Sequence, residues 1–104
     1  MELELKNGEV INIEVGPLFL EYMDDYQGGI NQLIDDWKNK ENLMYIVNFF
    51  AYAAIASNYD KPIEKRDTLK LITIKDLEKI AVFVSDKLPD VENHVSSISS
   101  SKHF

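Results

Sequence analysis

The sequence contains no cysteine, which excludes disulfide bonds, thiolate nucleophiles and cysteine-based zinc sites. A chain without cysteine fits a reducing compartment, and this one opens with Met-Glu-Leu-Glu rather than with a basic leader and an apolar stretch. The longest apolar tract, 43–56, is interrupted by Asn48 and is shorter than the ~20 residues of a membrane-spanning helix. We therefore expect a cytoplasmic protein that makes no use of a membrane.

Basic residues are also scarce. The 11 lysines and arginines are outnumbered by 18 acidic residues, which gives a net charge of −7. Such a surface repels the phosphate backbone of nucleic acids on average, and the one basic cluster, Lys61, Lys65 and Arg66, is interspersed with acidic residues. The charge balance argues against nucleic-acid binding.

The length of 104 residues suits one hydrophobic core rather than two. Apolar residues make up 45% of the chain, which is enough for a packed interior. We expect a single globular domain over 1–98, composed of a β-hairpin over 1–15 and a helical body over 16–98. The serine-rich end, 99–104, is expected to be a frayed tail.

Apolar and polar residues alternate at the start of the chain, as in a β-hairpin. Because side chains alternate between the two faces of a strand, the apolar residues of both strands must share one face. A two-residue turn would mix the faces. A three-residue loop, 6–8, with Gly8 in the left-handed conformation, instead places Leu3 opposite Ile11, so we predict this loop.

Helical spacing of apolar residues follows the hairpin. Pro17 is typical of a first helical position, and the glycine pair 28–29 is expected to end that helix. Asn31 is a candidate N-cap for a second helix. A third helix, capped by Asn42 and ending near Ser57, is apolar on nearly every side and is therefore predicted to lie at the centre.

The segment 58–68 combines Pro62 with alternating charges and is predicted to be a surface loop. The next residues, 69–72, fit either a short strand or the approach to another helix.

Thr73 and Asp76 form an approximate capping box for a fourth helix that ends at Pro89. Asp90 is then a candidate cap for a last short helix. The predicted class is α+β, mainly α: an N-terminal β-hairpin followed by four or five helices in a small bundle.

Patterns for catalysis and metal binding are missing from the sequence. The two histidines, His94 and His103, lie in the C-terminal stretch, and no serine has the surroundings of an activated nucleophile. The acidic pairs 24–25 and 35–36 have neither the spacing nor the glycine of a calcium loop, and neighbouring carboxylates on a helix point in different directions. Both pairs are predicted to face solvent. We expect no enzyme activity, no metal and no cofactor.

Aromatic residues are concentrated on the third helix. Tyr45, Phe49 and Tyr52 recur at the spacing that places them on one side of it. One interpretation is that all three belong to the core. The other is that a helix apolar on every side leaves one aromatic face for a protein partner.

Three segments stand out in the chain: LELKNGE at 3–9, PLFLEY at 17–22 and LKLITIKDL at 69–77. They accompany an acidic helical body with one long apolar helix. Taken together, these patterns resemble the small tail assembly chaperones of long-tailed phages and of prophages in low-GC Gram-positive bacteria.

The resemblance implies a non-enzymatic assembly factor that keeps the aggregation-prone tape measure protein soluble while tail-tube subunits polymerise around it. It implies no catalytic residue and no cofactor. Self-association into a homo-oligomer through the aromatic face is equally compatible with the sequence. The main alternative is a small acidic phage or bacterial regulatory protein that binds and inhibits a single protein partner; an enzyme subunit would need residues from another chain.

Overall fold

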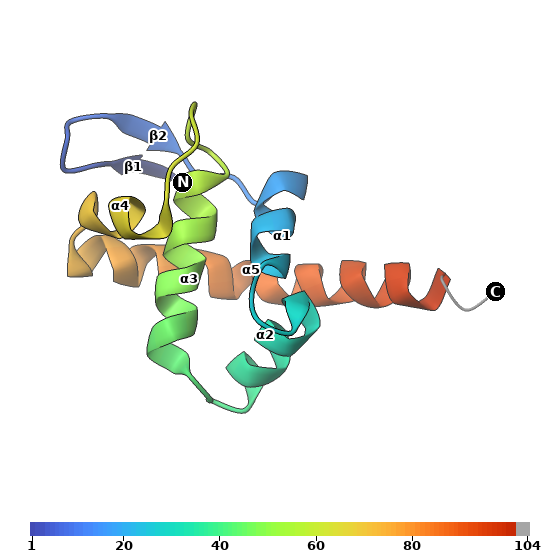
Figure 1. Cartoon of the computed structure of the whole chain (residues 1–104). Helices are drawn as coiled ribbons and strands as arrows, with labels where there is room; N and C mark the ends of the chain where they lie inside the picture. The colour runs from blue at the N-terminus through green and yellow to red at the C-terminus, as the bar shows by residue number, and fades with distance from the viewer. Residues whose placement is uncertain (102–104) are drawn as a thin grey trace.

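Five helices follow a short hairpin in the computed structural model, which describes the backbone of residues 1–101 and the side chains of residues 1–96 (Figure 1). The elements are β1 (Glu2–Glu4), β2 (Val10–Asn12), α1 (Pro17–Asp24), α2 (Gly29–Lys38), α3 (Leu43–Ala56), α4 (Lys65–Lys70) and α5 (Ile74–Ser101). The predicted class, mainly helical with an N-terminal antiparallel hairpin, is confirmed.

The hairpin has the predicted register. Leu3 lies opposite Ile11, and Gly8 takes a left-handed φ of 88° in the loop between the strands. The amide of Leu5 donates to the carbonyl of Glu9 over 2.8 Å, so the loop contains three residues. Leu3 and Leu5 are consequently buried on the same face of the hairpin.

The central helix of the fold is α3. It packs against α1, α2, α4 and α5, and Figure 1 shows it standing between α4 on one side and α1 and α2 on the other. A helix with neighbours all round needs apolar residues on all its faces, which explains why α3 has no polar stripe. Its fully buried side chains are Ile46, Phe50, Ala51, Ala53, Ala54 and Ile55.

The corner between α1 and α2 differs from the prediction. Gly28 and Gly29 have φ values of 93° and 85°, and α2 begins at Gly29 rather than after Asn31. The predicted cap at Asn31 is therefore wrong. The carboxylate of Asp24, at the end of α1, accepts a hydrogen bond of 2.9 Å from the amide of Ile30, so a side chain from the preceding helix satisfies one of the free amides of α2.

The predicted surface loop over 58–68 is shorter than expected, because α4 begins at Lys65. Thr68 is fully buried, and its hydroxyl donates to the carbonyl of Glu64 over 2.9 Å. The segment 69–72 is not a strand. Its first two residues end α4, and its last two, Leu71 and Ile72, lead towards α5. One backbone hydrogen bond, from the amide of Lys6 to the carbonyl of Leu71 over 2.8 Å, attaches this region to the hairpin.

The predicted capping box at the start of α5 is confirmed. The amide of Thr73 donates to the carboxylate of Asp76 over 3.0 Å, and the amide of Asp76 donates to the hydroxyl of Thr73 over 3.1 Å. Each side chain thus satisfies a backbone amide of the first turn, which fixes where the helix begins.

The helix does not end at Pro89, and the predicted cap at Asp90 is wrong. Leu88 and Val91, which flank these two positions, are both buried, so the apolar stripe of α5 continues past the proline. Pro89 itself is exposed. Figure 1 shows the C-terminal part of α5 extending beyond α1 and α2. The backbone of the expected tail is helical as far as Ser101, and 102–104 lie outside the described residues.

Candidate functional site

The three aromatic residues predicted to form a binding face lie side by side on α3 but differ in exposure. The ring centroids of Tyr45 and Phe49 are 6.2 Å apart, and those of Phe49 and Tyr52 are 5.9 Å apart. Phe49 is only 5% exposed and Tyr52 is half-buried, whereas Tyr45 is 50% exposed. Of the three, Tyr45 offers most of its surface to a partner.

Two tyrosines from the α1 region cover the rest of this face. The ring of Tyr22 meets Tyr52 edge to face at 5.5 Å, and Tyr26 meets Phe49 in the same way at 5.6 Å. Edge-to-face packing sets the positive edge of one ring against the negative face of the other, which is favourable beyond simple burial. The interpretation that the face belongs to the core therefore holds for Phe49.

A lysine from α4 lies over the exposed ring. The Nζ atom of Lys65 is 3.9 Å from the ring centroid of Tyr45 and 5.5 Å from that of Phe49. The face of an aromatic ring attracts cations, and the attraction strengthens as water is removed. Tyr45 thus takes part in a cation–π contact while half of its side chain remains exposed.

The first turn of α3 is the exposed apolar part of this helix. Leu43, Met44 and Tyr45, which we call the α3-start patch, are 39%, 68% and 50% exposed. These residues are more exposed than expected for a helix at the centre of the fold. Figure 1 shows this end of α3 reaching beyond α5, so its first turn has fewer neighbours than the rest of the helix. The apolar pattern is continuous through this turn, so helical spacing alone does not separate the exposed first turn from the buried turns.

A carboxylate is buried beside the α3-start patch. Asp36 of α2 is 7% exposed, although the sequence placed it with Asp35 on a solvated helix face. The hydroxyl of Tyr26 donates to its Oδ2 over 2.6 Å, and Nε2 of Gln32 donates to its Oδ1 over 2.8 Å. The prediction is wrong for Asp36 and holds for Asp35, which is exposed.

Asp36 lines a pocket of about 550 Å³ between α2 and the start of α3. The residues around it are Tyr26, Gln27, Gly28, Gln32, Asp36, Asn42 and Tyr45. Side-chain amides, hydroxyl groups and one carboxylate therefore surround a space that also touches the exposed ring of Tyr45.

The two partners of the buried hydrogen bond have opposite pKa shifts. Hydrogen bonds from Tyr26 and then Gln32 lower the pKa of Asp36, because they stabilise its ionised form. Burial, followed by the hydrogen bond to Asp36 and the charge of that carboxylate, raises the pKa of Tyr26 to about 12. At neutral pH, Asp36 is therefore an anion and Tyr26 is a neutral donor.

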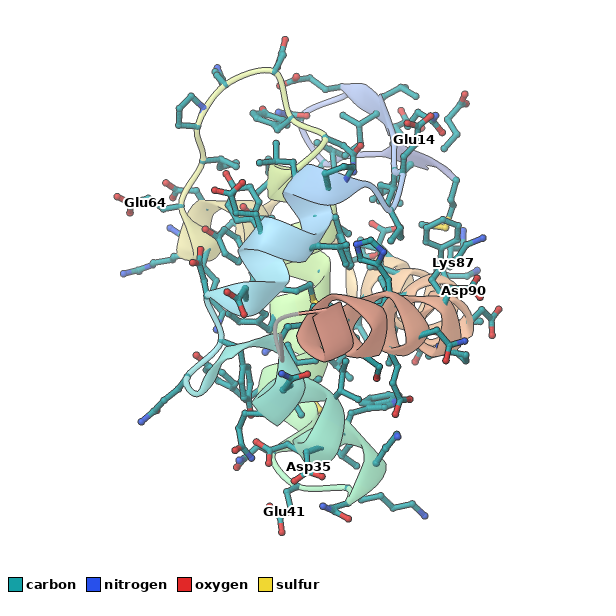
Figure 2. All side chains as sticks on the ribbon, turned by 90° about the vertical axis from the view of Figure 1, so that its right-hand side faces the viewer. Glu14, Asp35, Glu41, Glu64, Lys87 and Asp90 are labelled. Carbon is teal, nitrogen blue, oxygen red and sulfur yellow. The ribbon has the colours of Figure 1, made fainter. Side chains whose placement is uncertain are left out.

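A second cleft lies where the hairpin meets α5. Its lining includes Glu14, Lys87, Asp90 and His94, and Figure 2 shows the first three along one side of the molecule, away from Asp35 and Glu41 at its lower end. No hydrogen bond joins His94 to another side chain within residues 1–96. His103 lies outside the described residues.

In the part of the chain that the structure describes, no three histidine or acidic side chains are grouped closely enough to hold a metal ion. Nor does any helix there combine the length and the apolar character needed to cross a bilayer. Comparison of the chain with protein-family models, with curated proteins and with solved structures found no match.

Proposed function

We propose that this protein is a non-enzymatic tail assembly chaperone that binds an aggregation-prone tape measure protein during phage tail assembly. The observation that carries the proposal is the α3-start patch, an exposed apolar surface on an acidic domain. The resemblance of the sequence to small tail assembly chaperones supplies the identity of the client. In this function, the protein acts in the host cytoplasm, needs no cofactor and can also meet the tail tube protein.

The side chains of the α3-start patch suit a client that presents apolar segments of different sequence. Met44 has an unbranched, polarisable side chain that adapts to different surfaces, and Tyr45 offers a rigid ring with one polar end. A net charge of −7 makes complexes repel one another, which opposes their aggregation. Apolar contact would supply affinity and the acidic surface would supply solubility.

Coexpression with the tape measure protein tests this function. We expect the unmodified chain to raise the soluble fraction of the tape measure protein, and Met44→Asp to abolish that effect. The variant should fold, because Met44 is 68% exposed and an acidic residue in the first turn of a helix is favourable. Val82→Asp, at a 62% exposed position on α5, carries the same charge change and should keep the effect.

The alternative is an acidic regulatory protein that binds and inhibits one partner, and the strong negative charge supports it. The two functions separate in the same experiment. No increase in soluble tape measure protein with the unmodified chain, together with one tight stoichiometric partner, would favour the inhibitor. An equal loss of the effect in Met44→Asp and Val82→Asp would contradict the role of the α3-start patch.

A further inference from the structure

We propose that the pocket beside the α3-start patch binds a guanidinium group, an arginine side chain of the protein partner. This inference rests on the proposed function, since it names the chemistry by which a client segment would be recognised. It predicts that bound segments carry a basic residue next to apolar residues, so that the basic group enters the pocket while its neighbours cover Met44.

The carboxylate of Asp36 is a buried charge without a countercharge among the described residues. Asp36 is 7% exposed, and carboxylates buried to this extent are usually paired with a cation. The ion pair found among the described residues joins Lys38 to Glu92 and does not involve Asp36. Lys40, in the loop after α2, is exposed and makes no ion pair there either.

The carboxylate of Asp36 keeps acceptor capacity for a ligand. Tyr26 donates to one of its oxygens and Gln32 to the other, and the side chain of Asn42 also lies within reach of it. A carboxylate has about four acceptor positions, so these partners do not saturate it. A guanidinium presents two parallel donors that match this arrangement, whereas an ammonium acts as a point charge.

The ring of Tyr45 forms an aromatic wall of the pocket. Tyr45 is half exposed, and Nζ of Lys65 already lies 3.9 Å from its ring centroid. This ring therefore attracts cations in the protein itself. A planar guanidinium can stack on an aromatic ring while two parallel donors in its plane bond to a carboxylate, whereas an ammonium group has no such plane.

The test is a titration of the ¹⁵N-labelled protein with N-acetyl-arginine amide, followed by NMR. We expect saturable shifts in the side-chain amide signals of Gln32 and Asn42, which line the pocket. N-acetyl-citrulline amide, which has the same shape without the charge, should give no such shifts. N-acetyl-lysine amide should bind more weakly than the arginine probe.

Variants locate the site. Asp36→Asn should weaken arginine binding by about tenfold or more, as expected for loss of charged hydrogen bonds. Asp35→Asn changes the net charge equally on the exposed neighbour and should leave binding unchanged. Tyr45→Ala, at a half-exposed position that does not threaten the fold, should also weaken binding. Equal shifts from arginine and citrulline, or unchanged binding in Asp36→Asn and Tyr45→Ala, would overturn the proposal.

The titration tests the pocket inference and the coexpression experiment tests the chaperone function, so either can fail without the other. If the unmodified chain keeps the tape measure protein soluble but the arginine probe does not bind, the pocket inference is wrong and the chaperone function stands. If the probe binds at Asp36 but no client becomes soluble, the pocket inference stands and its natural partner is another protein.

Discussion

The hydroxyl of Tyr26 donates a 2.6 Å hydrogen bond to the carboxylate of Asp36, ten residues further along the chain. Tyr26 lies in the turn after α1, and Asp36 lies in the last turn of α2. The bond therefore closes the corner between these helices and fixes the ring that packs against Phe49. It also holds the carboxylate at the pocket wall.

Tyr26→Phe should lower the free energy of unfolding by about 1–2 kcal/mol. The ring is retained, so the loss reflects one buried hydrogen bond to a charged acceptor. Urea denaturation measures the change, and Asp35→Asn, on the exposed side of α2, should stay within about 0.5 kcal/mol of the unmodified chain. A Tyr26→Phe variant as stable as the unmodified protein would show that this bond does not stabilise the corner.

Stability should also fall in alkali because of the same residue. The pKa of Tyr26 is raised from 10.0 to about 12, so the native state holds this proton more tightly than the unfolded chain does. The resulting stabilisation is complete below pH 10 and is lost as the pH rises towards 12, by on the order of 1 kcal/mol per pH unit. Unfolding followed across this range should show a shallower decline for Tyr26→Phe. If stability declines equally in Tyr26→Phe and in the unmodified protein, the alkaline loss does not come from Tyr26.

Gly28→Ala should destabilise the protein by about 1–2 kcal/mol. Gly28 has a φ of 93°, and an added Cβ would lie 2.8 Å from both Cβ and Cγ of Gln32. Gly16 is the matched control, because its φ is −125° and a Cβ there meets nothing within 4 Å. Thermal melting should therefore separate Gly28→Ala from a nearly neutral Gly16→Ala, and equal melting temperatures would refute the explanation.

Pro89→Ala should stabilise the protein by about 2 kcal/mol. Proline inside a helix removes one backbone hydrogen bond and introduces a steric clash, which together cost about 3 kcal/mol. Alanine removes this cost, but it also gives the unfolded chain more conformational freedom, which offsets up to about 1 kcal/mol of the stabilisation. Pro89 is exposed, so no core contact is lost. Denaturation of Pro89→Ala beside Asp86→Ala checks this, and a less stable Pro89→Ala would show that α5 depends on the proline.

Local chemistry was sufficient to predict the hairpin and several helix ends. The register of Leu3 with Ile11 follows from side-chain alternation and one left-handed glycine, and the capping box at Thr73 is contained within four residues. Errors arose where tertiary packing outweighed local signals. Because Leu88 and Val91 are buried, α5 continues past Pro89 instead of ending there. At the start of α2, the side chain of Asp24 from the preceding helix takes the place of the expected cap.

The candidate site was predicted only in part, because exposure depends on neighbours that a helical period does not identify. Spacing placed Tyr45, Phe49 and Tyr52 on one side of the helix. It did not identify the two tyrosines, one from α1 and one from the turn after it, that cover Tyr52 and Phe49. Burial of Asp36 likewise depends on Tyr26, which comes from another element. The exposed Met44 and the pocket beside it therefore became visible only in the structure.

Site-specific photocrosslinking in cells that produce the tape measure protein is the most direct test of whether the α3-start patch contacts a client. Met44 is replaced by p-benzoylphenylalanine in one variant and Val82 in another; both positions are exposed, at 68% and 62%. The proposed function predicts a covalent adduct with the tape measure protein from position 44 and none from position 82. An adduct from position 82 alone, or from neither position while the client stays soluble, would contradict it.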